Sequence, residues 1–257
     1  MGYSLVTGAS SGIGLELCHL LAKDGCNLVL IARKEKELYQ LKNDLEDKYS
    51  IKAHVIVSDL QCIDAPLYIY NEIANLNIEI DNLINNAGFG SFGPFCEIDS
   101  QKDLAMLDVN CRALTHILKL FLPDMIKRKK GRILNVASTA AFMAGPYMSV
   151  YYASKAYVLS LSEALASETK GSGVTVSVLC PGPTKTPFQN KAQMKKSDFV
   201  TFGTMEASQV ALCGYKGMLK GKGVIVPGAL NKIMVRGGRL LPRNILTAMA
   251  KSTQKVK

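Results

Sequence analysis

The amino-acid sequence predicts an α/β fold: one doubly wound parallel sheet of about seven strands, with helices on both faces. Short apolar stretches rich in β-branched residues alternate with segments whose apolar residues recur at helical spacing. A length of 257 residues is typical of one large domain, so we expect residues 1–257 to form a single domain. A composition of 48% hydrophobic and 20% charged residues excludes disorder, collagen and coiled coil.

Seven stretches are predicted as strands because they are short and apolar, with β-branched residues among them. They are residues 3–7, 28–32, 54–57, 82–85, 132–137, 174–179 and 224–226. The segments between them are predicted as helices, and residues 37–48 are typical: Leu38, Leu41 and Leu45 return at helical spacing. Connections of this kind between parallel strands are right-handed.

Two stretches depart from this alternation. Residues 181–205 form a long connection rich in Pro, Thr, Lys and Phe, which we interpret as a lid over the substrate. Residues 227–257 form a basic C-terminal extension. The net charge of +10 lies entirely in residues 207–257, which hold ten Lys or Arg and no Asp or Glu.

The basic end of the chain has three interpretations. Residues 230–235 and 240–249 mix apolar side chains with Arg and Lys, so they could lie on an anionic membrane surface. They could also attract an acyl carrier protein or the phosphates of coenzyme A. We favour a third interpretation, an oligomer contact or solvated helices. Tyr215 is the only aromatic residue after position 206, which argues against stacking on nucleic acid.

The cysteines and histidines predict neither disulfides nor a metal site. The seven cysteines are odd in number and scattered, without the spacing of a zinc ribbon or a redox pair. His19, His54 and His116 are isolated from one another in the sequence. The N-terminal residues do not resemble a secretion signal, and no apolar run is long enough to span a membrane. We therefore expect a cytoplasmic protein with reduced thiols.

A glycine-rich turn, TGASSGIG at residues 7–14, directly follows the first predicted strand and precedes a predicted helix. Such a turn lets the backbone approach a pyrophosphate, and the helix begins with N–H groups directed at the anion. Gly14 lacks a side chain that would hold helix and strand apart. A turn of this kind also has a purely conformational explanation, and its spacing is GxxxGxG rather than GxGxxG. The order of elements favours a Rossmann-type dinucleotide-binding domain.

The end of the second predicted strand bears on the choice of cofactor. NAD sites place an acidic residue about 20 residues after the turn, where it binds the ribose 2′-hydroxyl. Here the chain reads Leu30-Ile31-Ala32-Arg33-Lys34, without a carboxylate. A guanidinium makes forked contacts to a 2′-phosphate, so Arg33 favours NADP(H). The alternative is that Arg33 and Lys34 merely begin a solvated helix.

A candidate catalytic group follows the fifth predicted strand. Ser138 comes at the end of that strand, and Tyr151 and Lys155 are spaced to share one helix face. A free phenol has a pKa of about 10, and a nearby positive charge lowers it toward the range useful for proton transfer. Tyr152 is three residues from Lys155 and could also face it, and such pairs arise by chance in many helices.

Together these motifs resemble the short-chain dehydrogenase/reductase family over almost the whole chain. The matching residues are TGASSGIG at 7–14, Asp59, NNAG at 85–88, Asn110 in Asp-Val-Asn, Ser138, the YxASK pattern at 151–155, and Pro181-Gly182. The resemblance implies that Tyr151, rather than Tyr152, is the acid–base group. It implies that Lys155 binds the nicotinamide ribose and lowers the Tyr151 pKa, that Ser138 bonds the substrate carbonyl, and that Asn110 kinks its helix and anchors a water.

The resemblance also implies a set of cofactor-binding residues. Asp59 and Asn86 should lie near the adenine and its ribose, Arg33 at the 2′-phosphate, and Thr184 and Thr186 on the nicotinamide side. The full set is Gly8, Ser10, Ser11, Gly12, Ile13, Gly14, Arg33, Asp59, Leu60, Asn86, Ala87, Gly88, Tyr151, Lys155, Pro181, Gly182, Thr184 and Thr186. Some NADP-using relatives carry a basic residue where this chain has Ser11, so recognition of the phosphate rests mainly on Arg33.

The expected function is NADPH-dependent reduction of an apolar ketone or aldehyde. Apolar candidates for the substrate walls are Phe89, Phe92, Phe95, Met143, Pro146, Tyr147, Met148, Phe188, Met194, Phe199 and Phe202, several of which have core or lid packing as the alternative. One competing function is reduction of a 3-oxoacyl thioester, and another is NADP binding without turnover in a regulatory or scaffold protein. The resemblance implies a homodimer or homotetramer built on the helices near residues 114–127 and 150–167.

Overall fold

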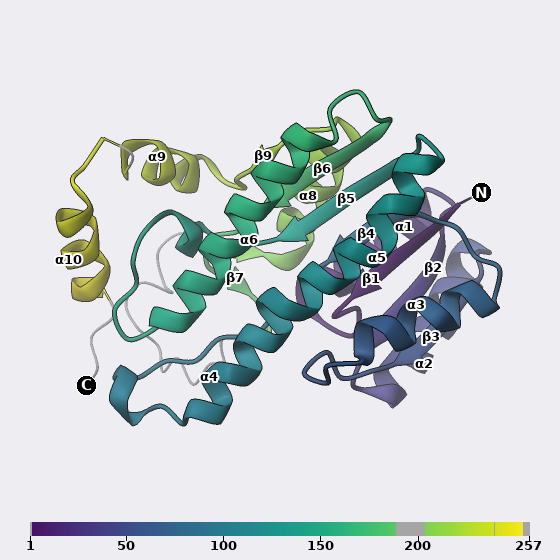
Figure 1. Cartoon of the computed structure of the whole chain (residues 1–257), viewed down its shortest axis with the longest axis horizontal. Helices are drawn as coiled ribbons and strands as arrows, with labels where there is room; N and C mark the ends of the chain where they lie inside the picture. Colours follow the sequence, from purple (N-terminus) through teal and green to yellow (C-terminus); the bar gives the residue numbers. More distant parts are fainter. Residues whose placement is uncertain (1, 189–203, 239, 254–257) are drawn as a thin grey trace.

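The computed structural model describes residues 2–188, 204–238 and 240–253, and it confirms the predicted α/β class. The described residues form a seven-stranded sheet in the order β3-β2-β1-β4-β5-β6-β9, with every pair parallel (Figure 1). The strands are β1 (Tyr3–Thr7), β2 (Asn27–Ala32), β3 (Ala53–Val57), β4 (Ile80–Asn85), β5 (Gly131–Val136), β6 (Val174–Leu179) and β9 (Val224–Ile225). Their bounds lie within two residues of the predicted ones.

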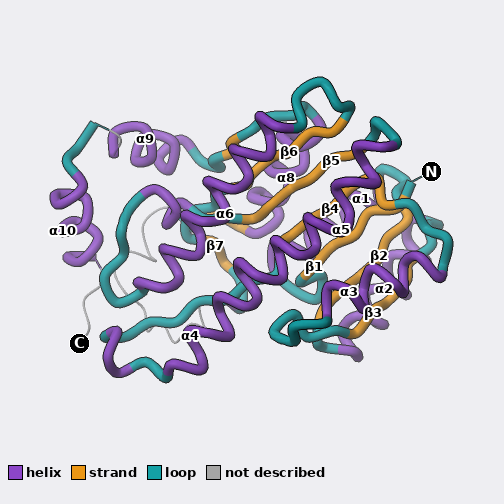
Figure 2. The backbone as a smooth tube through the Cα atoms, in the orientation of Figure 1, coloured by secondary structure: helices purple, strands orange, loops and turns teal. Residues whose placement is uncertain are grey.

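Helices connect the strands and cover both faces of the sheet (Figure 2). They are α1 (Gly12–Lys23), α2 (Glu35–Tyr49), α3 (Ala65–Asn75), α4 (Ser100–Leu107), α5 (Leu114–Lys127), α6 (Ser149–Glu168), α8 (Ala207–Leu219), α9 (Ala229–Gly238) and α10 (Arg243–Thr253). Short 3₁₀ turns η1 (Phe95–Glu97) and η3 (Thr139–Phe142) and a π-helical segment η2 (Asp108–Ala113) interrupt this pattern.

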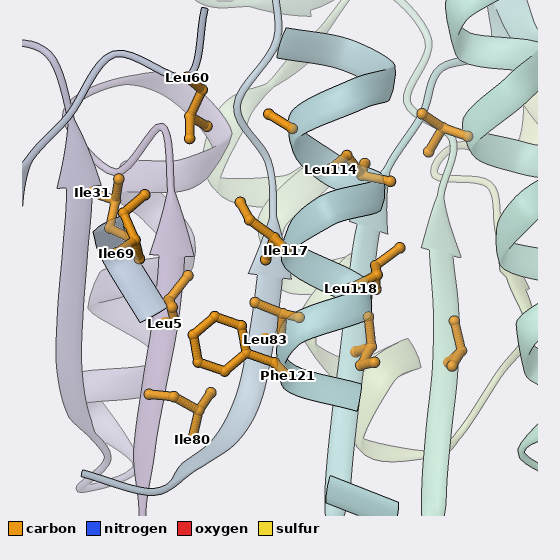
Figure 3. Packing of buried hydrophobic residues seen from close by; sticks show 14 of the residues in the cluster. Leu5, Ile31, Leu60, Ile69, Ile80, Leu83, Leu114, Ile117, Leu118 and Phe121 are labelled. Carbon is orange, nitrogen blue, oxygen red and sulfur yellow. The ribbon is translucent and has the colours of Figure 1, made fainter. Parts of the chain in front are cut away.

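Two apolar clusters, one on each face, hold the helices to the sheet. On one face Leu5 and Leu83 pack against Ile69 of α3 and Phe121 of α5, as the close view in Figure 3 shows. On the other face Val6 of β1 belongs to the cluster formed with α1, α2 and α8. Adjacent residues of one strand are thus buried on opposite faces, which explains why the strands are apolar throughout rather than alternating.

The strand order places a crevice at the carboxyl ends of β1 and β4. The chain winds outward from β1 in both directions, so the connections after β1 and β4 run to opposite faces and diverge. Thr7 at the end of β1 ties the two strands together: its Oγ1 accepts hydrogen bonds from the backbone N–H groups of Asn86 and Ala87, both at 3.0 Å. The glycine turn and the NNAG motif therefore meet at this edge.

The predicted lid is only partly within the described chain. Residues 189–203 lie outside the described residues, so their role as a lid stays a proposal. The two ends of this connection are joined by a short parallel pair, β7 (Thr184–Lys185) with β8 (Met205–Glu206). In the described part of the chain, none of the helices has both the length and the apolar character needed to cross a bilayer.

Candidate active site

A cavity of about 350 Å³ lies at the carboxyl edge of the sheet and gathers nearly all of the predicted site residues. Its walls come from the glycine turn, the ends of β2 to β6, the start of α6 and the chain after Pro181. Of the predicted site residues only Gly14 and Asn110 do not line the cavity. Both lie directly behind residues that do, as the next contacts show.

The glycine turn has the geometry that its sequence predicts. Gly8 and Gly12 adopt left-handed backbone angles, with φ of +67° and +59°. A Cβ on Gly14 would lie 2.3 Å from the Gly8 carbonyl oxygen, so helix α1 could not approach β1 with any side chain there. Ser11, at the N-terminus of α1, makes no side-chain capping bond to a described residue. The turn thus leaves a backbone cradle, open to the cavity, that fits the pyrophosphate of a dinucleotide.

Asn86 clamps this turn from the neighbouring strand. Its Nδ2 donates to the carbonyl oxygens of Thr7, at 3.0 Å, and Gly8, at 3.2 Å. The sequence did not predict this contact, because Asn86 and Gly8 are 78 residues apart. The resemblance to the family named both motifs but not the bond between them. Asn86 also lines the cavity, so it both supports the turn and is available to a ligand.

Two cations, Arg33 and Lys34, follow β2 and line the cavity. Arg33 lies at the cavity wall, half exposed, and its Nη1 is 3.5 Å from Oδ2 of Asp59. Lys34 pairs instead with Glu37 in the first turn of α2. An exposed ion pair of this kind contributes at most about 1 kcal/mol, so the Arg33 guanidinium can turn to a stronger anion. The arrangement fits a 2′-phosphate at Arg33.

Ser138, Tyr151 and Lys155 converge on one wall of the cavity. Ser138 caps the turn η3, where its Oγ accepts from the Ala140 N–H at 3.1 Å. The Tyr151 side chain is hydrogen-bonded to Ser138, and the Lys155 ammonium lies 5.9 Å from the centroid of the Tyr151 ring. Tyr152 also lines the cavity, but these two contacts belong to Tyr151, which favours Tyr151 as the acid–base residue.

The Tyr151 pKa moves in the direction opposite to the sequence expectation. Burial raises the pKa of Tyr151 to about 12, and the hydrogen bond with Ser138 offsets this only in part. The ring of Phe188 covers Tyr151 at a centroid distance of 5.5 Å. Lys155 was expected to lower this pKa. Its Nζ donates to the Val136 carbonyl oxygen at 3.0 Å, and its charge does not offset the effect of burial on the Tyr151 pKa.

Lys155 is itself shifted by its surroundings. The side chain is 4% exposed, and burial lowers the pKa of Lys155 to about 8. A buried ammonium is costly unless it has partners, so an anionic or hydroxyl-bearing ligand in the cavity would be attracted to it. A Cβ on Gly88 would lie 3.2 Å from Lys155 Nζ and 2.9 Å from Asn110 Oδ1, so this glycine leaves room for both groups.

Asn110 lies in the π-helical segment η2, which interrupts the path from α4 to α5. Its Oδ1 accepts from the Phe89 N–H at 3.1 Å and its Nδ2 donates to the Phe89 carbonyl at 3.0 Å. The same Nδ2 donates to Ser154 Oγ at 3.0 Å, a contact that sequence reasoning did not anticipate. The wide turn of a π-helix explains the distortion expected at Asn110, which anchors the chain after the NNAG motif to helix α6.

Part of the cavity wall is apolar. Of the side chains predicted as substrate walls, the cavity is lined by Phe89, Met148 and Phe188. The prediction is wrong for Phe95, which is exposed in η1, because a residue close to the NNAG motif in sequence need not face the same crevice. Phe92, Met143, Pro146 and Tyr147 lie outside the lining, and Met194, Phe199 and Phe202 lie outside the described residues.

The remaining titratable clusters do not form a second centre in the described chain. No group of three His, Cys, Asp or Glu gathers among the described residues as a metal site would require. All seven cysteines fall in described segments, and each is a free thiol. His54 lies 3.5 Å from the Tyr3 hydroxyl and His19 lies 3.9 Å from Asp44, so these two histidines have separate, local partners.

Known proteins resemble this chain in both sequence and structure. A family model described as short chain dehydrogenase matches residues 3–197. The very-long-chain 3-oxoacyl-CoA reductase of Mus musculus is 30% identical over 241 residues, which cover 91% of this chain and 76% of that protein. The 7beta-hydroxysteroid dehydrogenase of Mediterraneibacter gnavus is 31% identical over 189 residues, which cover 72% of this chain and 70% of that protein.

A solved structure extends the similarity to the whole chain. The short-chain dehydrogenase from Sphingobium yanoikuyae, solved in complex with NADPH, superimposes with a TM-score of 0.83 and 28% sequence identity. The superposition covers 100% of this chain and 99% of that one. The similarity therefore includes the sheet, both helical layers and the edge at which the cavity lies.

Proposed function

The chain belongs to the short chain dehydrogenase family, and we propose that it uses NADPH to reduce the carbonyl group of an apolar ketone or aldehyde. As a member it is an oxidoreductase that binds a nicotinamide cofactor and acts on CH–OH or C=O groups. One observation carries the proposal: Ser138, Tyr151 and Lys155 lie together on the wall of a cavity that also contains the glycine turn. A binding protein without turnover would not need this group of residues.

In the proposed reaction the residues bind the substrate oxygen and supply its proton. The nicotinamide supplies the hydride when it is bound. Ser138 donates a hydrogen bond to the carbonyl oxygen, and Tyr151 donates the proton that this oxygen acquires. A phenol with a pKa near 12 is fully protonated at neutral pH, which is the state that reduction requires. The Lys155 cation stabilises the phenolate left behind and, by resemblance to the family, binds the nicotinamide ribose.

The choice of NADPH over NADH rests on Arg33 and on the absence of a carboxylate at the end of β2. Arg33 lies at the cavity wall, where its guanidinium suits a 2′-phosphate, and Asp59 is the residue that holds it there now. The solved structure of the Sphingobium protein in complex with NADPH supports the same choice. Gly8, Ser10, Ser11, Gly12 and Ile13 would bind the pyrophosphate through the turn that they form.

Replacing Tyr151 with Phe tests the proposal directly. The variant keeps the ring that packs against Phe188 but loses the hydroxyl, so NADPH oxidation with an apolar ketone should fall by at least about a thousandfold. The affinity for NADPH, measured by fluorescence titration, should stay within about twofold, because the change removes one oxygen and keeps the ring that packs against Phe188. Turnover at the wild-type rate would show that another residue, Tyr152 first of all, donates the proton.

A second candidate substrate is a 3-oxoacyl thioester. The reductase of Mus musculus, whose name gives that substrate class, aligns with 91% of this chain, and residues 207–257 are strongly basic. NADPH oxidation should therefore be compared between acetoacetyl-CoA and apolar ketones of similar size. Faster, Tyr151-dependent consumption of the thioester would favour this second function, and a preference for the ketones would favour the first.

We also propose a homodimer or homotetramer in a reducing compartment such as the cytoplasm. Exposed apolar side chains on α5 and α6, Ile126 and Tyr157, suit a contact between helices of two copies. The seven free thiols favour reducing conditions. Light scattering on the purified protein would give the mass of the assembly, and a monomer at micromolar concentration would contradict the contact.

A further inference from the structure

Two short helices at the C-terminal end of the described chain carry exposed apolar residues that the proposed function does not use. We define the C-terminal arm as α9 and α10. Figure 1 shows both helices, in yellow, at one end of the molecule and apart from the helices that cover the sheet. We propose that this arm docks on a membrane surface containing anionic lipids.

Helix α9 has one side fixed to the protein and one side free for contact. Asn231 and Val235, one turn apart, are buried against the body. Leu230, Ile233 and Met234 are exposed and lie at the spacing of a single helix face, with Ile233 67% exposed. The helix is therefore already formed and anchored, and its outer apolar face needs no refolding to meet a partner.

Helix α10 also carries exposed apolar residues. Leu241, just before the helix, and Ile245 and Met249 within it are spaced by four residues and are all exposed. Leu240, in the connection between the two helices, is 87% exposed. On an ordinary solvated surface, exposed large apolar side chains occur singly. Their concentration on two neighbouring helices therefore indicates an interaction surface.

The charges of the arm select the kind of partner. Lys232 and Arg236 lie one turn apart on α9, and Arg243 and Lys251 lie on α10. The sequence has no Asp or Glu after Glu206, so no carboxylate of this segment neutralises them. A symmetric contact between two copies through this face would place cations against cations. A surface of anionic headgroups over an apolar layer offers both a counter-charge and a place for the apolar side chains.

The arm is attached at the rim of the cavity. Helix α9 packs on the turn η3, which begins directly after Ser138. The buried Asn231 amide occupies the space that a Cβ on Gly182 would need, at 2.5 Å, and Gly182 lines the cavity. Docking through the arm would therefore bring the cavity rim close to the lipid, where apolar substrates would be found. This consequence rests on the proposed function, whereas the docking itself does not.

Vesicle flotation with the full chain tests the docking. Vesicles of phosphatidylglycerol and phosphatidylcholine would be compared with vesicles of phosphatidylcholine alone, at low and high salt. The test variant is Ile233→Asp. The matched control is Ile63→Asp, because Ile63 precedes α3 at a distance from the arm in sequence and is also 67% exposed. Thermal unfolding with and without NADPH would show that each variant is folded and binds cofactor.

We expect the wild type and Ile63→Asp to float with the anionic vesicles at low salt and to be released at high salt. Ile233→Asp should bind these vesicles at least about tenfold more weakly, because it removes an apolar contact and adds a negative charge. Absence of the wild type from the anionic vesicles would overturn the proposal, as would equal binding by Ile233→Asp. A fall in the mass of Ile233→Asp in solution, with no wild-type flotation, would identify the arm as a contact between copies instead. Flotation does not depend on turnover, so its failure would leave the proposed function untouched.

Discussion

Tyr151 and Lys155 are shifted in opposite directions by the same burial. The pKa of Tyr151 rises to about 12 and that of Lys155 falls to about 8, because each neutral form is favoured where water is excluded. The site therefore holds a protonated phenol beside an ammonium that is costly to keep charged. A ligand that contacts the Lys155 ammonium would lower this cost, which links cofactor binding to the electrostatics of proton transfer.

Replacing Lys155 with Met should stabilise the cofactor-free protein at pH 7 while removing its activity. The pKa of Lys155 is about 8 in the folded protein and 10.5 ordinarily. The free-energy cost of burying its charge is therefore complete below pH 8 and vanishes above pH 10.5. After allowance for the lost hydrogen bond to Val136, we expect the free energy of unfolding to rise by about 2 kcal/mol at pH 7. Urea unfolding of the variant and the wild type at pH 7 and pH 10 measures this difference. A difference between variant and wild type that does not shrink at pH 10 would contradict the electrostatic origin.

Arg33→Asp should reverse the cofactor preference. The change removes the guanidinium proposed to bind the 2′-phosphate and places a carboxylate where a ribose 2′-hydroxyl would need one. We expect the affinity for NADPH to fall by about 10- to 100-fold and the affinity for NADH to rise. Fluorescence titration with both cofactors gives the ratio. Lys42→Asp serves as the control, because Lys42 lies in the middle of α2 and does not line the cavity, so the ratio should stay nearly unchanged.

The glycine turn acts as one unit with β1, α1 and the NNAG segment. A methyl group on Gly14 would lie 2.3 Å from the Gly8 carbonyl and 2.4 Å from Asn86 Nδ2, so Gly14→Ala must push α1 away from the end of β1. We expect a loss of roughly 1–3 kcal/mol in stability and at least about a tenfold loss in NADPH affinity. Gly223→Ala is the control, since a Cβ there would have no neighbour within 4 Å. Equal behaviour of the two variants would show that the turn tolerates the added group.

The elements of the sheet could be predicted from the sequence because most strands, such as β1 and β2, are buried on both faces. Their apolar stretches therefore stand out along the chain, and the predicted bounds fall within two residues of those observed. The pair formed by β7 and β8 could not be predicted, because each strand has only two residues and the contact joins Thr184 to Met205 across a long connection. The π-helical form of η2 depends in the same way on tertiary contacts of Asn110 with Phe89 and Ser154.

The candidate site was predictable as a set of residues but not as a set of contacts. The motifs identified the residues that line the cavity, since parallel strands bring their carboxyl ends to one edge. The hydrogen bond from the Lys155 ammonium to the Val136 carbonyl depends on the packing around the side chain. The sign of the Tyr151 pKa shift depends on burial of the side chain, to which a ring from another part of the chain, Phe188, contributes a contact. Spacing along the sequence predicts neither the contact of the Lys155 ammonium nor the sign of the Tyr151 pKa shift.

At the scale of the whole molecule, both apolar clusters share one sheet. Strands β1, β2, β4, β5 and β6 contribute residues to each cluster. If one helical layer separated, it would expose apolar residues of the same strands that the other layer packs against. The charge is distributed differently: the excess of +10 lies in residues 207–257, and the rest of the chain is neutral. Folding therefore depends on a core common to the molecule, whereas its long-range electrostatic attraction comes from one end.

We expect residues 1–257 to unfold in one cooperative transition, because the shared sheet couples the two clusters. NADPH at about 100 times its Kd should stabilise the folded state by about 2.7 kcal/mol and raise the Tm by roughly 5–10 °C. NADH at the same concentration should raise the Tm less, since it offers no 2′-phosphate to Arg33. Scanning calorimetry with each cofactor measures all three quantities. Two resolved transitions would show a second independently folding unit, and equal shifts with NADH and NADPH would remove the support for NADPH specificity.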